Sequence, residues 1–161
     1  MNGSTTRVGA SRLGRGVFAK RQLDVGQVIL RIKGPLITLT ETLAKGPKSF
    51  YPVQVAPDLY VDVVSPACFL NHSCKPNAGF RHSIFLVAIH PIGRDEEIVF
   101  DYSTTMSGDP EVMACMCAQP TCRGCIGNFE DLPSSIGLHY LALDIVQPFI
   151  SVRHRQKIDA E

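Results

Sequence analysis

The densest set of chemically active side chains is a run of cysteines in the last third of the sequence. Cys115 and Cys117 are separated by one residue, Cys122 follows after four more, and Cys125 after another two. This spacing lets a single loop wrap several thiolates around a tetrahedral zinc ion. The surrounding segment, 103–132, has little hydrophobic periodicity, so we expect a metal to order it. Zinc sites built from cysteine alone are structural, so we expect no metal-driven catalysis.

The spacing leaves the fourth zinc ligand open between the local Cys125 and the distant Cys74. The competing interpretation is four unrelated buried thiols. The first residues, Met1 to Gly16, are polar and basic and contain no apolar stretch of the kind found in a secretory signal. We therefore expect reduced thiols, and reduced thiols at this density favour zinc.

A second polar cluster, Asn71-His72-Ser73-Cys74, is followed by Pro76 and Asn77. Asn and Ser side chains bond nearby backbone groups and proline stiffens the exit, so the segment predicts a compact turn suited to holding a ligand. A purely structural turn remains an alternative. A nucleophile and base formed by Cys74 and His72 is disfavoured, because residues two apart do not face each other on a helix and no oxyanion loop is evident.

Two further segments carry weaker signals. The stretch from Asp95 to Tyr102 runs from an acidic turn through a short apolar strand, and the hydroxyl of Tyr102 must find a partner if it is buried. Its acidic residues are better explained as a solvated turn than as paired catalytic carboxylates. The turn Gly14-Arg15-Gly16 lacks the third glycine and the following helix of a dinucleotide site, so a hairpin is its simplest explanation.

The length of the chain fits one domain better than two, so we expect the elements that position these residues to belong to a single domain. The chain has 161 residues, of which 45% are hydrophobic and 19% charged, and this composition argues against disorder. Its net charge of +1 argues against binding of nucleic acid by bulk charge. The longest apolar run, Phe85 to Ile89, is far shorter than the ~20 residues of a membrane helix.

The first two thirds of the chain predict short strands, because β-branched and apolar runs alternate with turn residues. The expected strands are Val17–Ala19, Gln27–Ile32, Leu36–Thr40, Tyr51–Val55, Leu59–Val64, Ala78–His90 with a turn near Arg81–Ser83, and Glu97–Phe100. The segment Glu41 to Lys48 is a loop or one short helix. Three- and four-residue apolar steps predict one helix over Ser134–Phe149, capped by Ser134 or Ser135 and ended or kinked by Pro148. A polar, mobile tail, Ser151–Glu161, follows.

Taken in order, four motifs resemble one known family. Gly-Arg-Gly-Val-Phe-Ala, Asn-His-Ser-Cys-x-Pro-Asn, Glu-Glu-Ile-x-Phe-Asp-Tyr and Cys-x-Cys-x4-Cys-Arg-Gly follow one another between Leu13 and Phe129. Together they resemble the SET-domain protein lysine methyltransferases with a post-SET zinc motif, in a small stand-alone form of the bacterial type.

The resemblance implies a mostly β fold with short helices. It consists of several small curved sheets, with the segment Asn71–Asn77 threaded under a neighbouring loop like a pseudoknot, a zinc-ordered post-SET loop and a C-terminal helix. The implied organisation is an N-terminal extension (1–12), a SET domain (13–104), a post-SET zinc-binding segment (105–132) and a C-terminal helix with its tail (133–161).

The resemblance also implies roles for individual residues. Tyr102 matches the catalytic tyrosine and Tyr51 resembles a second tyrosine of the pocket. S-adenosylmethionine is the implied methyl donor, and its implied binding residues are Arg15, Gly16, Val17, Phe18, Asn71, His72 and Ile126. Phe100 occupies the substrate-channel position that tunes the number of methyl groups, and phenylalanine there resembles enzymes that add two or three.

The implied ligands of the structural zinc ion are Cys74, Cys115, Cys117 and Cys122. Cys68 stands where the family usually has an arginine.

The sequence therefore predicts methyl transfer from S-adenosylmethionine to a lysine amine of a protein, with histone tails as one possible substrate. The alternatives are a catalytically silent SET-fold module that binds a protein tail and a zinc-organised interaction protein. We expect a protein or peptide partner, no direct binding of nucleic acid, no membrane, and a monomer or weak homodimer. A bacterial member of this type is expected in the cytoplasm, with delivery into a host cell or nucleus as a further possibility.

Overall fold

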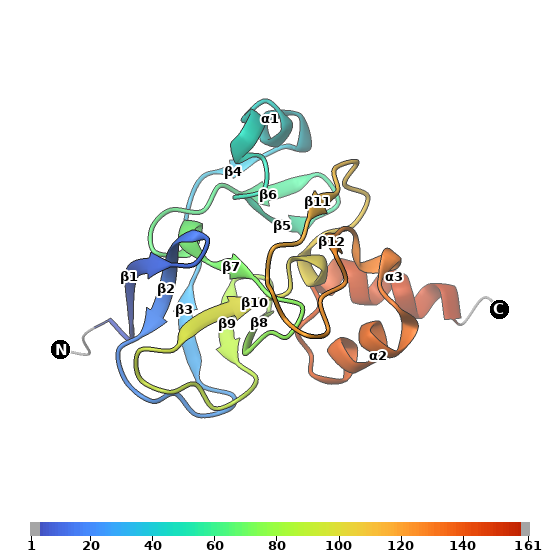
Figure 1. The fold of residues 1–161 in the computed structure, drawn as a ribbon. Helices are drawn as coiled ribbons and strands as arrows, with labels where there is room; N and C mark the ends of the chain where they lie inside the picture. The colour runs from blue at the N-terminus through green and yellow to red at the C-terminus, as the bar shows by residue number, and fades with distance from the viewer. Residues whose placement is uncertain (1–3, 159–161) are drawn as a thin grey trace.

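A computed structural model describes residues 4–158 of the chain as small sheets and short helices (Figure 1). The sheet that carries the polar motifs has four strands. In spatial order they are β1 (Thr6–Ser11), β2 (Gly14–Ala19), β10 (Glu97–Phe100) and β7 (Asn71–His72). β1, β2 and β10 are antiparallel, whereas β7 runs parallel to β10, with Val99 opposite Asn71 and Phe100 opposite His72. This parallel pair brings the two polar motifs to one edge of the sheet.

The other sheets surround this one. One has the order β3 (Val28–Arg31), β9 (Phe85–Ala88) and β8 (Ala78–Arg81), and another has the order β4 (Leu36–Ile37), β6 (Leu59–Val61) and β5 (Val53–Ala56). The cysteine segment contributes a two-stranded ribbon of β11 (Met113–Ala114) and β12 (Cys125–Ile126). These small sheets confirm the fold class expected from the motifs.

The helices are short. They are α1 (Leu39–Leu43), α2 (Ser134–Ala142), α3 (Pro148–Ile158) and the 3-10 helices η1 (Gly46–Lys48), η2 (Ala67–Phe69), η3 (Tyr102–Thr105) and η4 (Phe129–Asp131). Figure 1 shows α2 and α3 together at one side of the molecule, beyond β8 and the cysteine segment. No helix in the described part of the chain is long and apolar enough to cross a membrane.

The expected single C-terminal helix over Ser134–Phe149 is wrong. α2 ends at Ala142, and Asp144 takes a left-handed conformation with φ of 56°. Pro148 begins α3 rather than ending a helix, because its missing N–H is not needed at the first helical position. The expected tail is therefore helical as far as Ile158, and residues 159–161 lie outside the described residues.

Other differences concern two helix caps and one strand that was not predicted. Thr38 caps α1 and forms a capping box with Glu41, so the expected strand Leu36–Thr40 stops after Ile37. The cap of α2 is Pro133 without a side-chain hydrogen bond, so neither Ser134 nor Ser135 has the expected capping role. β1 was not predicted, and it pairs with β2 along its whole length, within the expected N-terminal extension.

Two buried apolar clusters hold the fold together. The larger lies among the sheets and includes Leu86, Ile98 and Phe100. The smaller joins the C-terminal helices to the outer side of β9 and includes Val87, Tyr140 and Ile145. Gly79 permits this packing, because a Cβ atom there would lie 2.6 Å from the Cβ of Ile145.

Candidate functional site

Two hollows adjoin the segment 70–72, which leads into and forms β7. The first is a narrow cavity of about 40 Å³. The second is a wider groove of about 440 Å³, within the usual range for small-ligand sites. Leu70 lines the cavity, whereas the next residues, Asn71 and His72, line the groove. Consecutive residues thus form walls of both hollows.

Tyr102 lines the narrow cavity. Its hydroxyl donates a hydrogen bond of 2.6 Å to the backbone oxygen of Leu70, and burial raises the pKa of this phenol far above its ordinary value. The Phe100 and Tyr102 rings lie 4.8 Å apart between centroids. Tyr51 lies at the same cavity and is half exposed. Both expected tyrosines and Phe100 therefore share one aromatic-walled space.

Further residues line this cavity. Cys68 is partly buried there, and burial raises the pKa of its thiol. Tyr60 and Asp109 lie on the same wall, and burial followed by the charge of Asp109 raises the pKa of Tyr60. Most residues that line the cavity are thus aromatic or apolar, and a carboxylate lies among them.

In the groove, Asn71 joins three elements. Its side-chain amide donates to the backbone oxygen of Arg15 at 2.9 Å and to the Glu97 carboxylate at 2.8 Å. Ser11 donates to the same carboxylate oxygen at 2.9 Å. A Cβ atom at Gly16 would collide with this carboxylate, so a larger residue there would displace the Glu97 side chain. Glu97 is therefore not part of a solvated turn.

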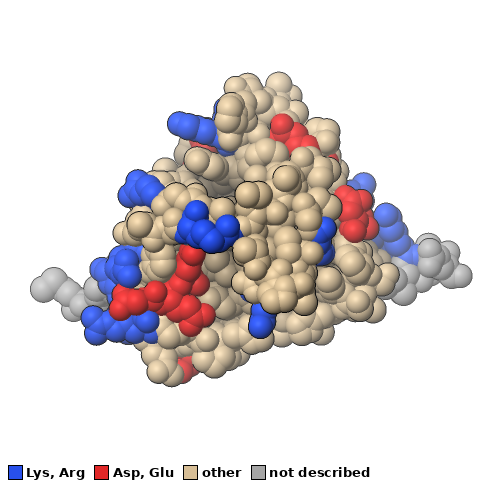
Figure 2. All heavy atoms as spheres, in the orientation of Figure 1, with Lys and Arg blue, Asp and Glu red and all other residues tan. Residues whose placement is uncertain are grey.

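The acidic residues at the start of β10 have two different roles. Asp95 forms an exposed ion pair with Arg7 at 2.8 Å, as expected of a solvated residue. Figure 2 shows acidic side chains gathered over this part of the molecule, with basic side chains beside them. Glu97 instead organises the groove.

The other residues expected to bind the methyl donor lie near the groove in sequence but not on its wall. The Arg15 guanidinium lies over the Phe69 ring at 4.0 Å. Val17 is fully buried in the core, and Phe18 lies beneath the Arg7 guanidinium. Ile126 is buried in β12 and pairs with Met113. None of Arg15, Gly16, Val17, Phe18 and Ile126 lines the groove as it stands.

The cysteine segment folds back onto the end of β7. Ligand atoms of His72, Cys74, Cys115 and Cys117 all lie within 4.8 Å of one another. Cys122 is outside this set, but its thiol interacts with those of Cys115 and Cys117. Cys125 is exposed. The fold therefore brings Cys74 to the local cysteines.

The thiols have different proton affinities. Burial raises the pKa of Cys115 and of Cys74. Burial also acts to raise the pKa of Cys117, but hydrogen bonds from the Cys74 and Gln119 backbone and the neighbouring thiols lower it to about 7. A thiolate, the form that binds metal, is thus favoured at one member of the cluster.

His72 and Cys74 face each other, with 3.3 Å between Nε2 and Sγ. The sequence argument against this contact assumed a helix, but β7 ends at His72 and the chain bends at Cys74, which brings the two side chains together. The Tyr102 N–H donates to Nδ1 of His72 at 3.2 Å, which assigns the ring proton to Nε2. Burial lowers the pKa of His72 to about 4, so the ring is neutral.

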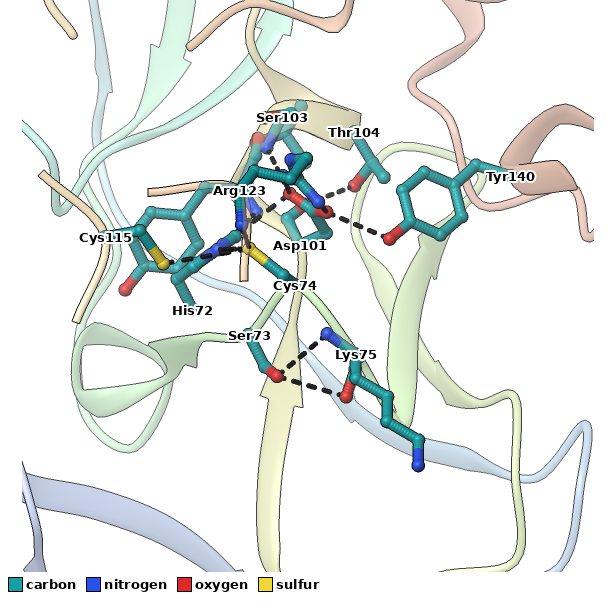
Figure 3. Close-up of polar contacts among 12 residues, drawn as sticks. His72, Ser73, Cys74, Lys75, Asp101, Ser103, Thr104, Cys115, Arg123 and Tyr140 are labelled. Carbon is teal, nitrogen blue, oxygen red and sulfur yellow. Dashed lines mark hydrogen bonds and ion pairs between the residues drawn. The ribbon is translucent and has the colours of Figure 1, made fainter. Parts of the chain in front are cut away.

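A buried carboxylate, that of Asp101, contacts both Arg123 of the cysteine segment and Tyr140 of α2 (Figure 3). Asp101 has no side-chain exposure, and the Arg123 guanidinium approaches both its oxygens, at 2.9 Å and 2.7 Å. The backbone N–H of Arg123 donates to Cys74 Sγ at 3.4 Å. Tyr140 from α2 donates its hydroxyl proton to Asp101 at 2.9 Å.

The sequence analysis did not select Asp101, Arg123, Tyr140 or Glu97 as site residues. Asp101 directly precedes Tyr102 and Arg123 directly follows Cys122, so both lay within the recognised motifs, but no role was assigned to either. In the sequence, Tyr140 was recognised only as one of the apolar residues on the buried face of the C-terminal helix. Its hydroxyl contact joins residues far apart in the chain, which no local pattern indicates.

Comparisons with known proteins identify the family and support the fold. The sequence model of the SET domain matches residues 14–103. The solved structure of a humanized mutant of the Chaetomium thermophilum Polycomb Repressive Complex 2, bound to the inhibitor GSK126, is similar in fold. Its TM-score is 0.54 at 21% identity, over 64% of this chain and 15% of that one.

Named relatives are similar in sequence. Methyltransferase flvH from Aspergillus flavus is 30% identical over 111 residues, covering 66% of this chain and 62% of the relative. Human histone-lysine N-methyltransferase 2B is 30% identical over 68% of this chain and 5% of the relative. An H3 lysine-36 specific histone-lysine N-methyltransferase from Candida albicans is 29% identical over 68% of this chain and 15% of the relative. The chain spans less than two thirds of the length of each.

Proposed function

The chain belongs to the SET-domain family, and from this premise we propose that it is a protein-lysine N-methyltransferase. It takes a methyl group from S-adenosylmethionine and places it on the side-chain amine of a lysine in a protein substrate. The names of its relatives support histone tails as the first substrates to test.

One observation carries the proposal. Tyr102 lies on the wall of a narrow aromatic cavity, and the segment that accepts its hydrogen bond continues directly into the wall of a larger groove. A lysine side chain is long, thin and mostly apolar, which suits the cavity. A nucleoside bearing an amino acid needs the wider groove, whose wall includes the polar residues Asn71 and Glu97. The reacting atoms then meet near Tyr102.

Tyr102 can position the amine but cannot remove its proton as a base. Its raised pKa keeps the phenol neutral, and its proton is engaged by the Leu70 oxygen. The phenolic oxygen is therefore an acceptor for an amine N–H. A free lysine amine is protonated near pH 7, and the apolar cavity and a nearby sulfonium both favour its neutral form.

Methyl transfer then needs no strong base in the protein. The amine attacks in line, the sulfur–methyl bond breaks as the nitrogen–methyl bond forms, and the sulfonium becomes a neutral thioether. The methylated amine releases its extra proton to water. The residues of the chain contribute by orienting the amine and excluding water. Phe100 adds no hydroxyl to the cavity, which supports addition of two or three methyl groups.

A structural zinc ion fits the cysteine cluster, and we propose Cys74, Cys115, Cys117 and Cys122 as its ligands. A protonated Nε2 has no lone pair for a metal, so the ring assignment makes His72 a donor to Cys74 rather than a ligand. Cys122 completes the set through its contacts with Cys115 and Cys117. Four thiolates close the coordination sphere, and zinc then supplies order rather than chemistry.

The test of the proposal is Tyr102→Phe. We expect the variant to fold, with a loss of about 1 kcal/mol for the missing hydrogen bond. In calorimetry it should bind S-adenosylmethionine like the unaltered protein. Radiolabelled methyl transfer to core histones should fall to background. Full activity of the variant contradicts the role of Tyr102. Cofactor binding by the unaltered protein, with no transfer to histones or to a cell lysate, indicates instead a silent module that binds protein tails.

A further inference from the structure

Helix α2 reaches the candidate site through one hydroxyl group. Tyr140 is 4% exposed, and its hydroxyl donates to Oδ2 of Asp101 at 2.9 Å (Figure 3). The SET domain match ends at residue 103, so Tyr140 lies outside the matched region. It also lies outside both hollows. Any effect on methyl transfer must therefore act through another residue.

The Asp101 carboxylate is fully engaged. Oδ1 accepts from the Ser103 N–H at 3.1 Å and from Nη2 of Arg123 at 2.9 Å. Oδ2 lies 2.7 Å from Nη1 of Arg123 and accepts the Tyr140 hydroxyl proton. Hydrogen bonds to a buried charged group are stronger than those between neutral groups. Tyr140 is the contact that ties this carboxylate to α2.

This carboxylate holds two functional segments. Asp101 caps η3, the 3-10 helix that begins at Tyr102. Arg123 follows Cys122 and donates its backbone N–H to Cys74. A movement of the Asp101 side chain would therefore shift both the proposed catalytic tyrosine and the cysteine segment. That segment supplies Cys117 and Gln119 to the wall of the groove.

We propose that Tyr140 is a positioning residue for methyl transfer. Its hydroxyl fixes Asp101, and Asp101 in turn holds Tyr102 and the cysteine segment in the geometry that binds the methyl donor. The kinetic part of this inference rests on the proposed function. Helix α2 then contributes to the geometry of the site through Tyr140.

The ring and the hydroxyl of Tyr140 have separable roles. The ring packs in the smaller apolar cluster with Val87 and Ile145. Phenylalanine fills the same space, so Tyr140→Phe removes the hydrogen bond and leaves the packing. Oδ2 of Asp101 then retains Arg123 alone.

The matched control is Arg81→Met. Arg81 donates from Nη2 to the Leu143 backbone oxygen at 3.0 Å, just after α2, and forms no hydrogen bond or ion pair with Asp101 among the described residues. Each variant loses one hydrogen bond between the α2 region and the sheets: Tyr140→Phe loses the bond to Asp101, and Arg81→Met loses the bond to Leu143. Any difference between them therefore reports on the link to Asp101 rather than on the attachment of α2.

The kinetic experiment compares both variants with the unaltered protein, using core histones and S-adenosylmethionine at a temperature well below unfolding. For Tyr140→Phe we expect KM for S-adenosylmethionine to rise roughly tenfold, the size of effect expected for one hydrogen bond to a charged group. We expect kcat to fall and KM for histone to stay within about twofold. Arg81→Met should keep all three values. A merely destabilising change lowers the active fraction and leaves KM unaltered.

A second measurement does not depend on activity. Amide hydrogen exchange of residues 115–126 should accelerate in Tyr140→Phe and stay unchanged in Arg81→Met. Unaltered KM values together with unaltered exchange overturn the inference while the proposed function stands. If the unaltered protein transfers no methyl group, the proposed function fails, and the exchange rates alone decide whether Tyr140 holds the cysteine segment.

Discussion

Asparagine at position 101 should destabilise the protein strongly, although it keeps the size and shape of the side chain. Four donor groups face the carboxylate: the Ser103 N–H, Nη1 and Nη2 of the Arg123 guanidinium, and the Tyr140 hydroxyl. An asparagine amide has one oxygen, so in either orientation its NH2 group meets donors. The substitution also leaves the Arg123 guanidinium, with 12% side-chain exposure, without a negative partner.

The expected cost follows from this burial. Removing one partner of a buried ion pair costs about 3–5 kcal/mol. The matched control is Asp95→Asn, which removes the partner of Arg7 from an ion pair with side chains 42% and 58% exposed. An exposed pair of this kind contributes about 0–1 kcal/mol. The two variants make the same chemical change at buried and exposed positions.

Urea unfolding measures both variants, with thiol reductant and zinc held constant because a bound metal adds to apparent stability. We expect the free energy of unfolding to fall by about 3 kcal/mol or more for Asp101→Asn and by less than about 1 kcal/mol for Asp95→Asn. Equal small losses would refute the argument that Asp101 carries a buried, fully engaged charge.

Three further predictions concern the metal, the packing and the pH dependence. Cys74→Ser should lower the zinc content measured by elemental analysis, whereas Cys125→Ser should leave it intact; the reverse result would favour the local four-cysteine site. Gly79→Ala should cost about 1–3 kcal/mol in denaturant unfolding, because the new methyl group would lie 2.6 Å from Ile145 Cβ. Gly93→Ala, where the nearest atom is 3.4 Å away, should cost much less. The methyl-transfer rate should rise between about pH 7 and pH 9 as the substrate amine loses its proton. It should show no decline from ionisation of Tyr102, since burial raises the pKa of that phenol; an inactivating step in this range would contradict the assignment.

The parts of the site that are local in sequence could be predicted. Cys115, Cys117 and Cys122 lie within one loop, and their spacing alone indicated a metal cluster. The strand before Tyr102 was evident from its β-branched and apolar residues. The pairing of these segments with Asn71 and Cys74 followed only from the resemblance to a family, since no local rule states that β7 lies parallel to β10.

The remaining features depend on contacts between distant segments. The hydroxyl of Tyr140 meets a carboxylate 39 residues earlier in the chain, and helical periodicity reports only which face is apolar. The split of the C-terminal helix was missed because Pro148 was assigned to the end of a helix, whereas it starts one. Glu97 was assigned to a solvated turn, because a sequence does not show that Asn71 and Ser11 surround it.

The strands β8 and β9 separate the two apolar clusters, and this has a practical consequence for any shortened form of the protein. Leu86 faces the larger cluster and Val87 the smaller, so β9 is covered on both sides and reads as a continuous apolar run. A chain cut after residue 131 would lose α2 and α3 and expose Val87 and Ile89 to water. Such a fragment should self-associate and precipitate even if its sheets form.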